Sequence, residues 1–72
     1  MIYKVHATIT KKDYLFNIIK KDNIYKANKV FSFGTKYFLE NTHFNGNGLS
    51  IIEAIGNAIG QYNDFTFSKL AD

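Results

Sequence analysis

The chain has 72 residues, which suffice for one compact unit and leave no room for another, so we expect a single domain over residues 1–72. Such a chain buries only about 60% of the surface it exposes when unfolded, and small scaffolds usually depend on disulfides, a metal, oligomerisation or a rich apolar core. Cysteine is absent, which excludes disulfides, a thiol nucleophile and a thiolate metal site. Because 46% of the residues are apolar and 17% are aromatic, a rich core and oligomerisation remain.

The chain is mildly basic, with a net charge of +3 from nine lysines, no arginine and six acidic residues. Arginine supplies the planar fork that reads guanine edges, so its absence disfavours sequence-specific DNA recognition but not general attraction to phosphates. No apolar run approaches the roughly twenty residues of a membrane span, and the first residues lack the pattern of a secretory signal. We therefore expect a soluble cytoplasmic protein with no membrane partner. Its many Lys, Asn, Ile, Phe and Tyr residues are typical of AT-rich coding, as in a low-GC bacterium or its phages and mobile elements.

The first 44 residues show the patterns of β-strands. Four extended segments are predicted: 2–10, 14–20, 24–33 and 36–44. The first alternates apolar and polar residues, as a half-buried strand does, and the second is apolar on both faces, as a central strand is. Asp22 and Asn23 favour a tight turn between the second and third segments, because both side chains tolerate positive φ. These segments predict an antiparallel meander.

A helix is predicted after the strands. Asn45-Gly46-Asn47-Gly48 is expected to end the sheet, and beyond it the apolar residues change to a helical period. Ser50 and Glu53 have the spacing of a capping box, in which each side chain bonds to the backbone N–H of the other residue. A helix over about 51–62 should follow, with one broad apolar face.

The predicted fold class is α+β: an antiparallel meander of three to four strands with one C-terminal helix packed on one face. Phe65 and Phe67 alternate with polar residues and indicate a short final strand or a docked tail. Gly56 and Gly60 lie four residues apart within the predicted helix. A stripe of two glycines lets backbone approach backbone, so close contact with the sheet or with a partner is expected there.

One helix of about twelve residues covers only one face of a small sheet, yet large apolar side chains fall on both faces of the predicted strands. Some of them should therefore point away from the helix, and exposed apolar patches usually mark interaction surfaces. The alternative is a sheet that curls enough to bury both faces in one core. The candidate binding residues are aromatic and lysine residues that alternate along the strands: Tyr25, Lys26, Lys29, Phe31, Lys36, Tyr37 and Phe38.

Residues for catalysis or metal binding form no recognisable pattern. His6 and His43 could join Asp13 or Glu40 in a metal site, but no pair has the close spacing typical of structural zinc sites. Serines can be combined with either histidine, yet the sequence contains no nucleophile-elbow turn. We therefore predict that the protein is not an enzyme and has no cofactor and no metal.

The segment from Phe44 to Gly60 contains a strand end, Gly-x-Gly and then Ser-x-x-Glu-Ala-x-x-x-Ala. It resembles the last strand and second helix of double-stranded-RNA-binding domains, over about 17 of the 72 residues. The resemblance implies a strand–turn–helix fold for this segment. Where that family has two lysines after the serine, this chain has Ile51 and Ile52, and the family's first helix has no counterpart among the predicted elements.

Three functions are compatible with these patterns. The first is a non-enzymatic protein-interaction module that acts through an exposed sheet face or edge, as a homodimer or by binding a partner protein, as inhibitors from phages and mobile elements do. The second is a nucleic-acid-binding protein in which bases stack on the aromatic residues and lysines follow the backbone. The third is a sensor of a small ligand at the Gly46–Ser50 turn, where helical N–H groups attract anions.

Overall fold

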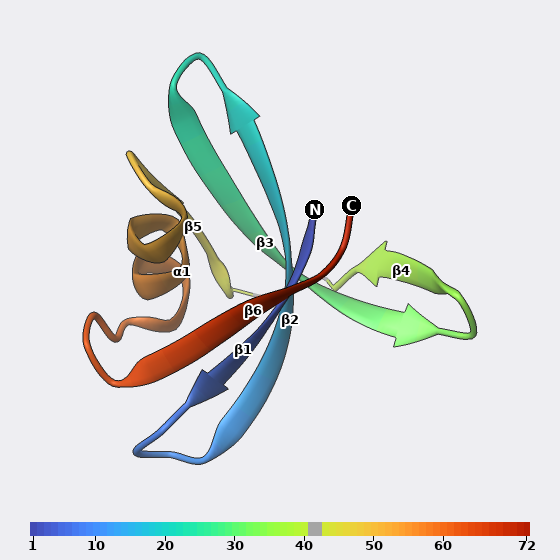
Figure 1. The fold of residues 1–72 in the computed structure, drawn as a ribbon, viewed down its shortest axis with the longest axis horizontal. Helices are drawn as coiled ribbons and strands as arrows, with labels where there is room; N and C mark the ends of the chain where they lie inside the picture. The colour runs from blue at the N-terminus through green and yellow to red at the C-terminus, as the bar shows by residue number, and fades with distance from the viewer. Residues whose placement is uncertain (41–42) are drawn as a thin grey trace.

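The computed structural model describes residues 1–40 and 43–72, which form a twisted antiparallel sheet and one helix (Figure 1). The six strands are β1 Ile2–Ala7, β2 Lys12–Lys21, β3 Ile24–Phe33, β4 Lys36–Leu39, β5 Asn45–Gly48 and β6 Phe65–Ala71. Five lie in the order β4–β3–β2–β1–β6, and β5 also pairs with β3. The α+β class is confirmed, but the predicted three to four strands understate the count, because β5 and β6 join the sheet. The extended run predicted over 36–44 includes residues 41 and 42, which lie outside the described residues.

Two-residue turns join β2 to β3 and β3 to β4. Asp22 and Asn23 have φ values of 53° and 65° and bring Lys21 opposite Ile24. Positive φ at both central residues is the type I′ geometry, whose twist matches that of the strands it joins. The predicted turn is confirmed. Gly34, with a φ of 64°, begins the second turn.

Helix α1, Ile51–Ile59, lies directly against β5. A Cβ atom on Gly46 would lie 2.5 Å from the backbone nitrogen of Ala58, and one on Gly48 would lie 2.6 Å from that of Ala54. Only glycine permits so close an approach of two backbones. The prediction that this segment ends the sheet is therefore wrong. β5 is a strand of the sheet, and its two glycines leave room for the helix backbone.

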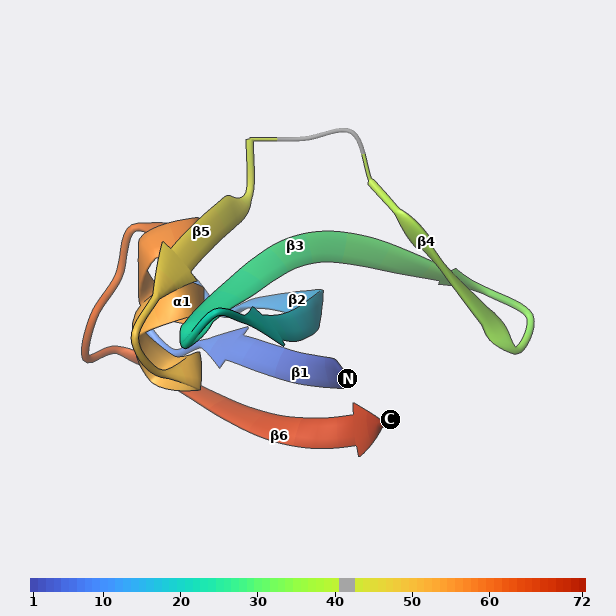
Figure 2. The same cartoon turned by 90° about the horizontal axis from the view of Figure 1, so that it is seen from above.

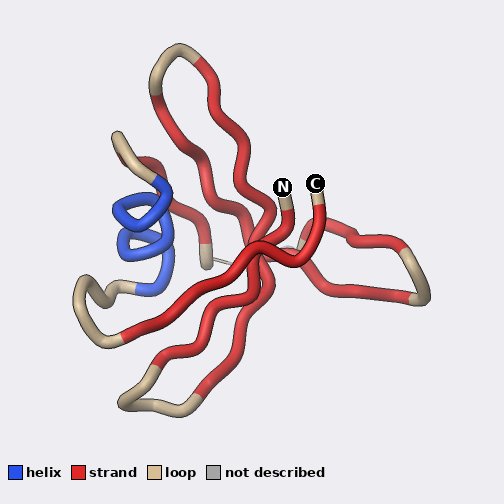
Figure 3. Tube along the Cα trace, in the orientation of Figure 1, coloured by secondary structure: helices blue, strands red, loops and turns tan. Residues whose placement is uncertain are grey.

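The ends of α1 are capped. The Ser50 hydroxyl accepts a hydrogen bond from the backbone N–H of Glu53 at 3.1 Å, which confirms this half of the predicted capping box and makes Ser50 the N-cap. Gly60 has a φ of 71° and forms the C-cap, so the helix is shorter than the predicted 51–62. The close contact with the sheet predicted at Gly56 and Gly60 is not found: a Cβ on Gly56 would lie 2.9 Å from the Gln61 carbonyl oxygen, just after the helix, and no atom lies within 4 Å of one on Gly60. The helix is followed by β6, as the tube in Figure 3 shows, and is not the last element.

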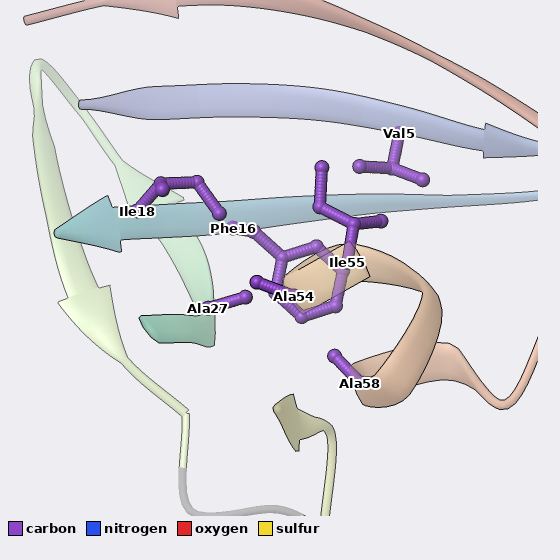
Figure 4. Packing of buried hydrophobic residues seen from close by; sticks show 7 residues of the cluster. All are labelled: Val5, Phe16, Ile18, Ala27, Ala54, Ile55 and Ala58. Carbon is purple, nitrogen blue, oxygen red and sulfur yellow. The ribbon is translucent and has the colours of Figure 1, made fainter. Parts of the chain in front are cut away.

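The core lies between α1 and the face of the sheet that the helix covers (Figure 4). It consists of Val5, Phe16, Ile18, Ala27, Ala54, Ile55 and Ala58. The predicted apolar side of the first strand is confirmed, because Val5 and Ala7 are fully buried, whereas Ile9 lies beyond the strand and is exposed. The helix and three strands thus supply one continuous apolar cluster, against which further partly buried residues pack, among them Tyr14, Phe44 and Phe65.

Candidate interaction surface

The β3–β4 hairpin leaves the body of the sheet. The ladder between β2 and β3 ends at the pair Leu15 and Val30, and beyond Val30 the third strand pairs only with β4. Since β2 continues beside β1, the sheet forks at this point. Figures 1 and 2 show the hairpin projecting on the side of the molecule opposite α1. Within the described residues, no other strand pairs with this part of β3 or with the outer edge of β4.

The fork contains an open groove of about 550 Å³. Tyr14 and Leu15 of β2 line one side, and Val30 and Phe31 of β3 line the other. Val30 is nearly buried, whereas Phe31, the next residue along the strand, is half exposed. The change from buried to exposed side chains therefore coincides with the point at which the two strands separate.

Large apolar side chains gather on the hairpin and remain exposed. We call them the hairpin surface: Phe31, Phe33, Tyr37, Phe38 and Leu39. Phe31 and Phe38 lie opposite one another in the ladder, and their rings stack with centroids 5.6 Å apart. Because side chains alternate along a strand, Phe33 shares their face, whereas Tyr37 and Leu39 lie on the other. The hairpin is thus apolar on both faces.

The structure divides the predicted binding residues into two groups. Phe31, Lys36, Tyr37 and Phe38 lie together on the hairpin, as expected of one site. Tyr25, Lys26 and Lys29 lie earlier on β3, where the strand is still part of the main sheet. Their separation follows from the fork, which sequence patterns do not show.

Sequence analysis missed two members of the hairpin surface, Phe33 and Leu39, which are 76% and 70% exposed. The signal that could have found them is Gly34-Thr35, a two-residue turn between two apolar runs. Such a turn fixes the register of the hairpin and brings both residues onto it.

Lys29 is held at the base of the hairpin by contacts within the chain. Its ammonium lies 3.0 Å from a carboxylate oxygen of Glu40 and over the rings of Phe44 and Tyr14, at 5.1 and 5.7 Å from their centroids. Ion pairs and cation–π contacts of this kind hold a lysine side chain in one position. Its side chain is only 22% exposed, so Lys29 fastens the hairpin to the body and presents little charge to solvent.

The first histidine also has a partner within the chain. His6 lies 2.7 Å from Asp13, between a ring nitrogen and a carboxylate oxygen, in a shallow hollow that Lys4 and Thr66 also line. In residues 1–40 and 43–72, no three His, Asp or Glu side chains gather in a way that could hold a metal ion. His43 is exposed in the connection before β5.

The Gly46–Ser50 segment, predicted as a ligand-binding turn, packs against helix α1, which follows it. Its two glycines face the backbone of α1, the Asn57 side chain donates to the Asn47 carbonyl at 2.6 Å, and the Ser50 hydroxyl caps the helix. The Asn47 carbonyl and the Ser50 hydroxyl thus have partners within the fold.

Comparison with family models, with curated proteins and with solved structures finds no match for the chain. In the part of the chain that the structure describes, no helix has the length and apolar character that crossing a membrane requires.

Proposed function

We propose that the protein is a non-enzymatic interaction module that binds a protein surface through its β3–β4 hairpin. The observation that carries this proposal is the gathering of five exposed apolar side chains on one projecting hairpin. Other large apolar side chains of the described residues are also exposed, but they are scattered over the rest of the chain, whereas five gather on this hairpin. Leaving these five exposed lowers the stability of the fold and is explained by a contact that covers them.

The size of the patch supports this proposal. The rings of Phe31, Phe33 and Phe38, which share one face, are between 43% and 76% exposed, which at ~200 Å² per ring leaves about 330 Å² of aromatic surface on that face open to solvent. Apolar patches of a few hundred Å² are often functional, and aromatic residues are enriched at the core of protein interfaces. A phage or mobile-element protein of this kind would act by occupying the surface of a host protein.

Nucleic-acid binding is the second candidate, because aromatic residues on an open strand are suited to base stacking. Such a site also needs a positively charged track along the backbone of the strand. Lys36 is the one lysine among the hairpin residues 30–39, and the Lys29 ammonium is already paired with Glu40. The apolar character of the hairpin therefore favours a protein partner.

A matched pair of variants tests the proposal. Phe33→Ser/Leu39→Ser removes two side chains of the hairpin surface, and Ile9→Ser/Leu49→Ser removes two that are equally exposed, at 69% and 74%, but lie elsewhere. We expect the wild type and the second variant to self-associate in light scattering or to capture a protein from host lysate, with or without nuclease. The hairpin variant should lose both properties.

Two results would contradict this expectation. If the two double variants bind as the wild type does, the hairpin is not the contact surface. If capture disappears with nuclease and weakens steeply with salt, the partner is a nucleic acid. A gain of thermal stability in a metabolite screen, unaffected by the hairpin variant, would instead indicate a ligand at the Gly46–Ser50 turn.

A further inference from the structure

We infer that the partner of the hairpin is a second copy of this chain, joined edge to edge through β4 about a two-fold axis at Phe38. This inference rests on the proposed function and adds the identity of the partner and the register of the contact. Three features of the described residues carry it: the unpaired edge of β4, the order of charges along it, and the apolar surface on both sides.

The outer edge of β4 presents backbone groups that can pair with another strand. The N–H of Glu40 donates to the carbonyl of Lys29 at 3.0 Å, so its backbone groups face β3. In an antiparallel ladder the residues alternate between facing the partner strand and facing away from it. The N–H and C=O groups of Tyr37 and Leu39 therefore point outward, where the described chain supplies no partner strand.

The other edge of the sheet is less suited to pairing. β6 shows a register shift against β1 between Ile2 and Tyr3. Irregular pairing is one of the features by which proteins prevent edge strands from pairing with other chains. The ladder between β3 and β4 has no such shift.

Residues 36–40, Lys-Tyr-Phe-Leu-Glu, carry a positive charge at one end and a negative charge at the other. The Glu40 carboxylate lies 3.0 Å from the Lys29 ammonium of its own chain, but its side chain is 39% exposed, so a second lysine can approach it. Pairing two copies in antiparallel fashion about Phe38 puts Lys36 opposite the second copy's Glu40 at both ends of the contact. It also puts the outward groups of Tyr37 opposite those of the second copy's Leu39, as a ladder requires. An axis at Tyr37 or Leu39 would also join outward groups, but neither would bring Lys36 opposite Glu40. The charges thus select one register.

The same register makes the apolar surface continuous across the two copies. Residues that lie directly opposite in an antiparallel pair project from the same face, so Phe38 meets the second copy's Phe38, each flanked by a stacked Phe31. On the other face, Tyr37 meets the second copy's Leu39. Phe31 and Phe33 lie on β3, one strand away from the second copy, so the contact covers only part of the exposed ring surface and is smaller than a standard specific interface. The dimer should therefore be weak and its population should depend on concentration.

Charge reversal tests the register. Lys36→Glu places two acidic pairs in the contact and Glu40→Lys places two basic pairs, so each variant alone should weaken the dimer by about tenfold to a hundredfold in light scattering. An equimolar mixture restores opposite charges at both ends and should recover the wild-type mass. Lys26→Glu makes the same change of charge outside the hairpin and serves as the control, which should dimerise normally.

Glu40→Lys also removes the ion pair with Lys29, so thermal unfolding must show that this variant is folded. If it is not, Leu39→Pro compared with Leu39→Ala gives an independent test. Both remove the leucine side chain, but only proline removes the outward N–H, and proline is tolerated at such edge positions. The alanine variant should then dimerise more strongly than the proline variant.

The inference is overturned if the wild type is monomeric at several hundred micromolar, if neither charge reversal weakens the dimer, or if the mixture of two folded variants fails to recover it. These results would not by themselves refute the proposed function. A monomeric chain that captures another protein through Phe33 and Leu39 refutes the second copy and leaves the hairpin as the contact surface.

Discussion

Replacing Gly46 by alanine should destabilise the protein far more than the loss of one hydrogen atom suggests. The added Cβ would lie 2.5 Å from the Ala58 nitrogen and 2.6 Å from the Ala54 carbonyl oxygen. Both are backbone atoms of α1, so no side chain can rotate away, and the helix itself must shift off β5. Overpacking of this kind costs about 1–3 kcal/mol, and we expect the upper part of that range.

A smaller opposing term must be considered. Alanine loses less backbone entropy on folding than glycine, which favours the variant by about 0.4–1 kcal/mol. The net loss should therefore be about 2 kcal/mol, equivalent to a fall in Tm of roughly 8–16 °C for a chain of this length.

Thermal unfolding followed by circular dichroism measures this effect. Asn47→Ala is the control, because residue 47 is the next position on β5 and its side chain points away from the helix. We expect the control to change the free energy of unfolding by less than about 0.5 kcal/mol. A Gly46→Ala variant that melts within a few degrees of the wild type would refute the close packing of α1 on β5.

Three further predictions concern the core, the helix cap and the C-terminus. Phe16 is fully buried, so Phe16→Ala should cost about 3–5 kcal/mol of stability and leave the chain largely unfolded. Phe33→Ala, at an exposed position, should change the free energy of unfolding by less than about 0.5 kcal/mol. Denaturant titration measures both, and equal losses would contradict the burial of Phe16. Ser50→Ala removes the cap and should cost about 1 kcal/mol, with Ser50→Gly costing only a few tenths; equal losses would show that the hydroxyl is not the cap. A hydrogen bond from Lys69 and its charge hold the pKa of the Asp72 carboxyl below its ordinary value, so Lys69→Met should raise that pKa in an NMR titration. Since the folded pKa of Asp72 is lower than the unfolded one, any stability from this pair is present above the unfolded pKa and is lost as the pH falls through the folded pKa. An unchanged Asp72 pKa in the variant would show that the pair does not form in solution.

Local patterns predicted those parts of the fold that local forces determine. The alternation around Val5, the turn at Asp22-Asn23 and the cap at Ser50 each depend on a few neighbouring residues. β5 was missed because its glycines have no side chains to show a strand period, and its place in the sheet depends on α1 packing against it. That packing brings together residues whose contact no short window of sequence reveals.

The candidate site was predicted in part for the same reason. Phe31 and Phe38 were recognised as aromatic residues on strands that one helix could not cover, and the structure places both on the hairpin. Tyr25 and Lys29 carry the same pattern but remain in the main sheet, because β3 separates from β2 only after Val30. The position of that fork follows from strand pairing between distant segments, so the sequence pattern alone does not show that the predicted residues fall into two groups.

Amide hydrogen exchange measured by NMR at increasing protein concentration tests most directly whether a second copy occupies the edge of β4. The N–H groups of Tyr37 and Leu39 point outward, while that of Phe38 faces β3 by the same alternation. The account predicts that exchange at Tyr37 and Leu39 slows as concentration rises, whereas Phe38 is protected throughout. Rapid exchange at Tyr37 and Leu39, unchanged up to several hundred micromolar, would contradict it.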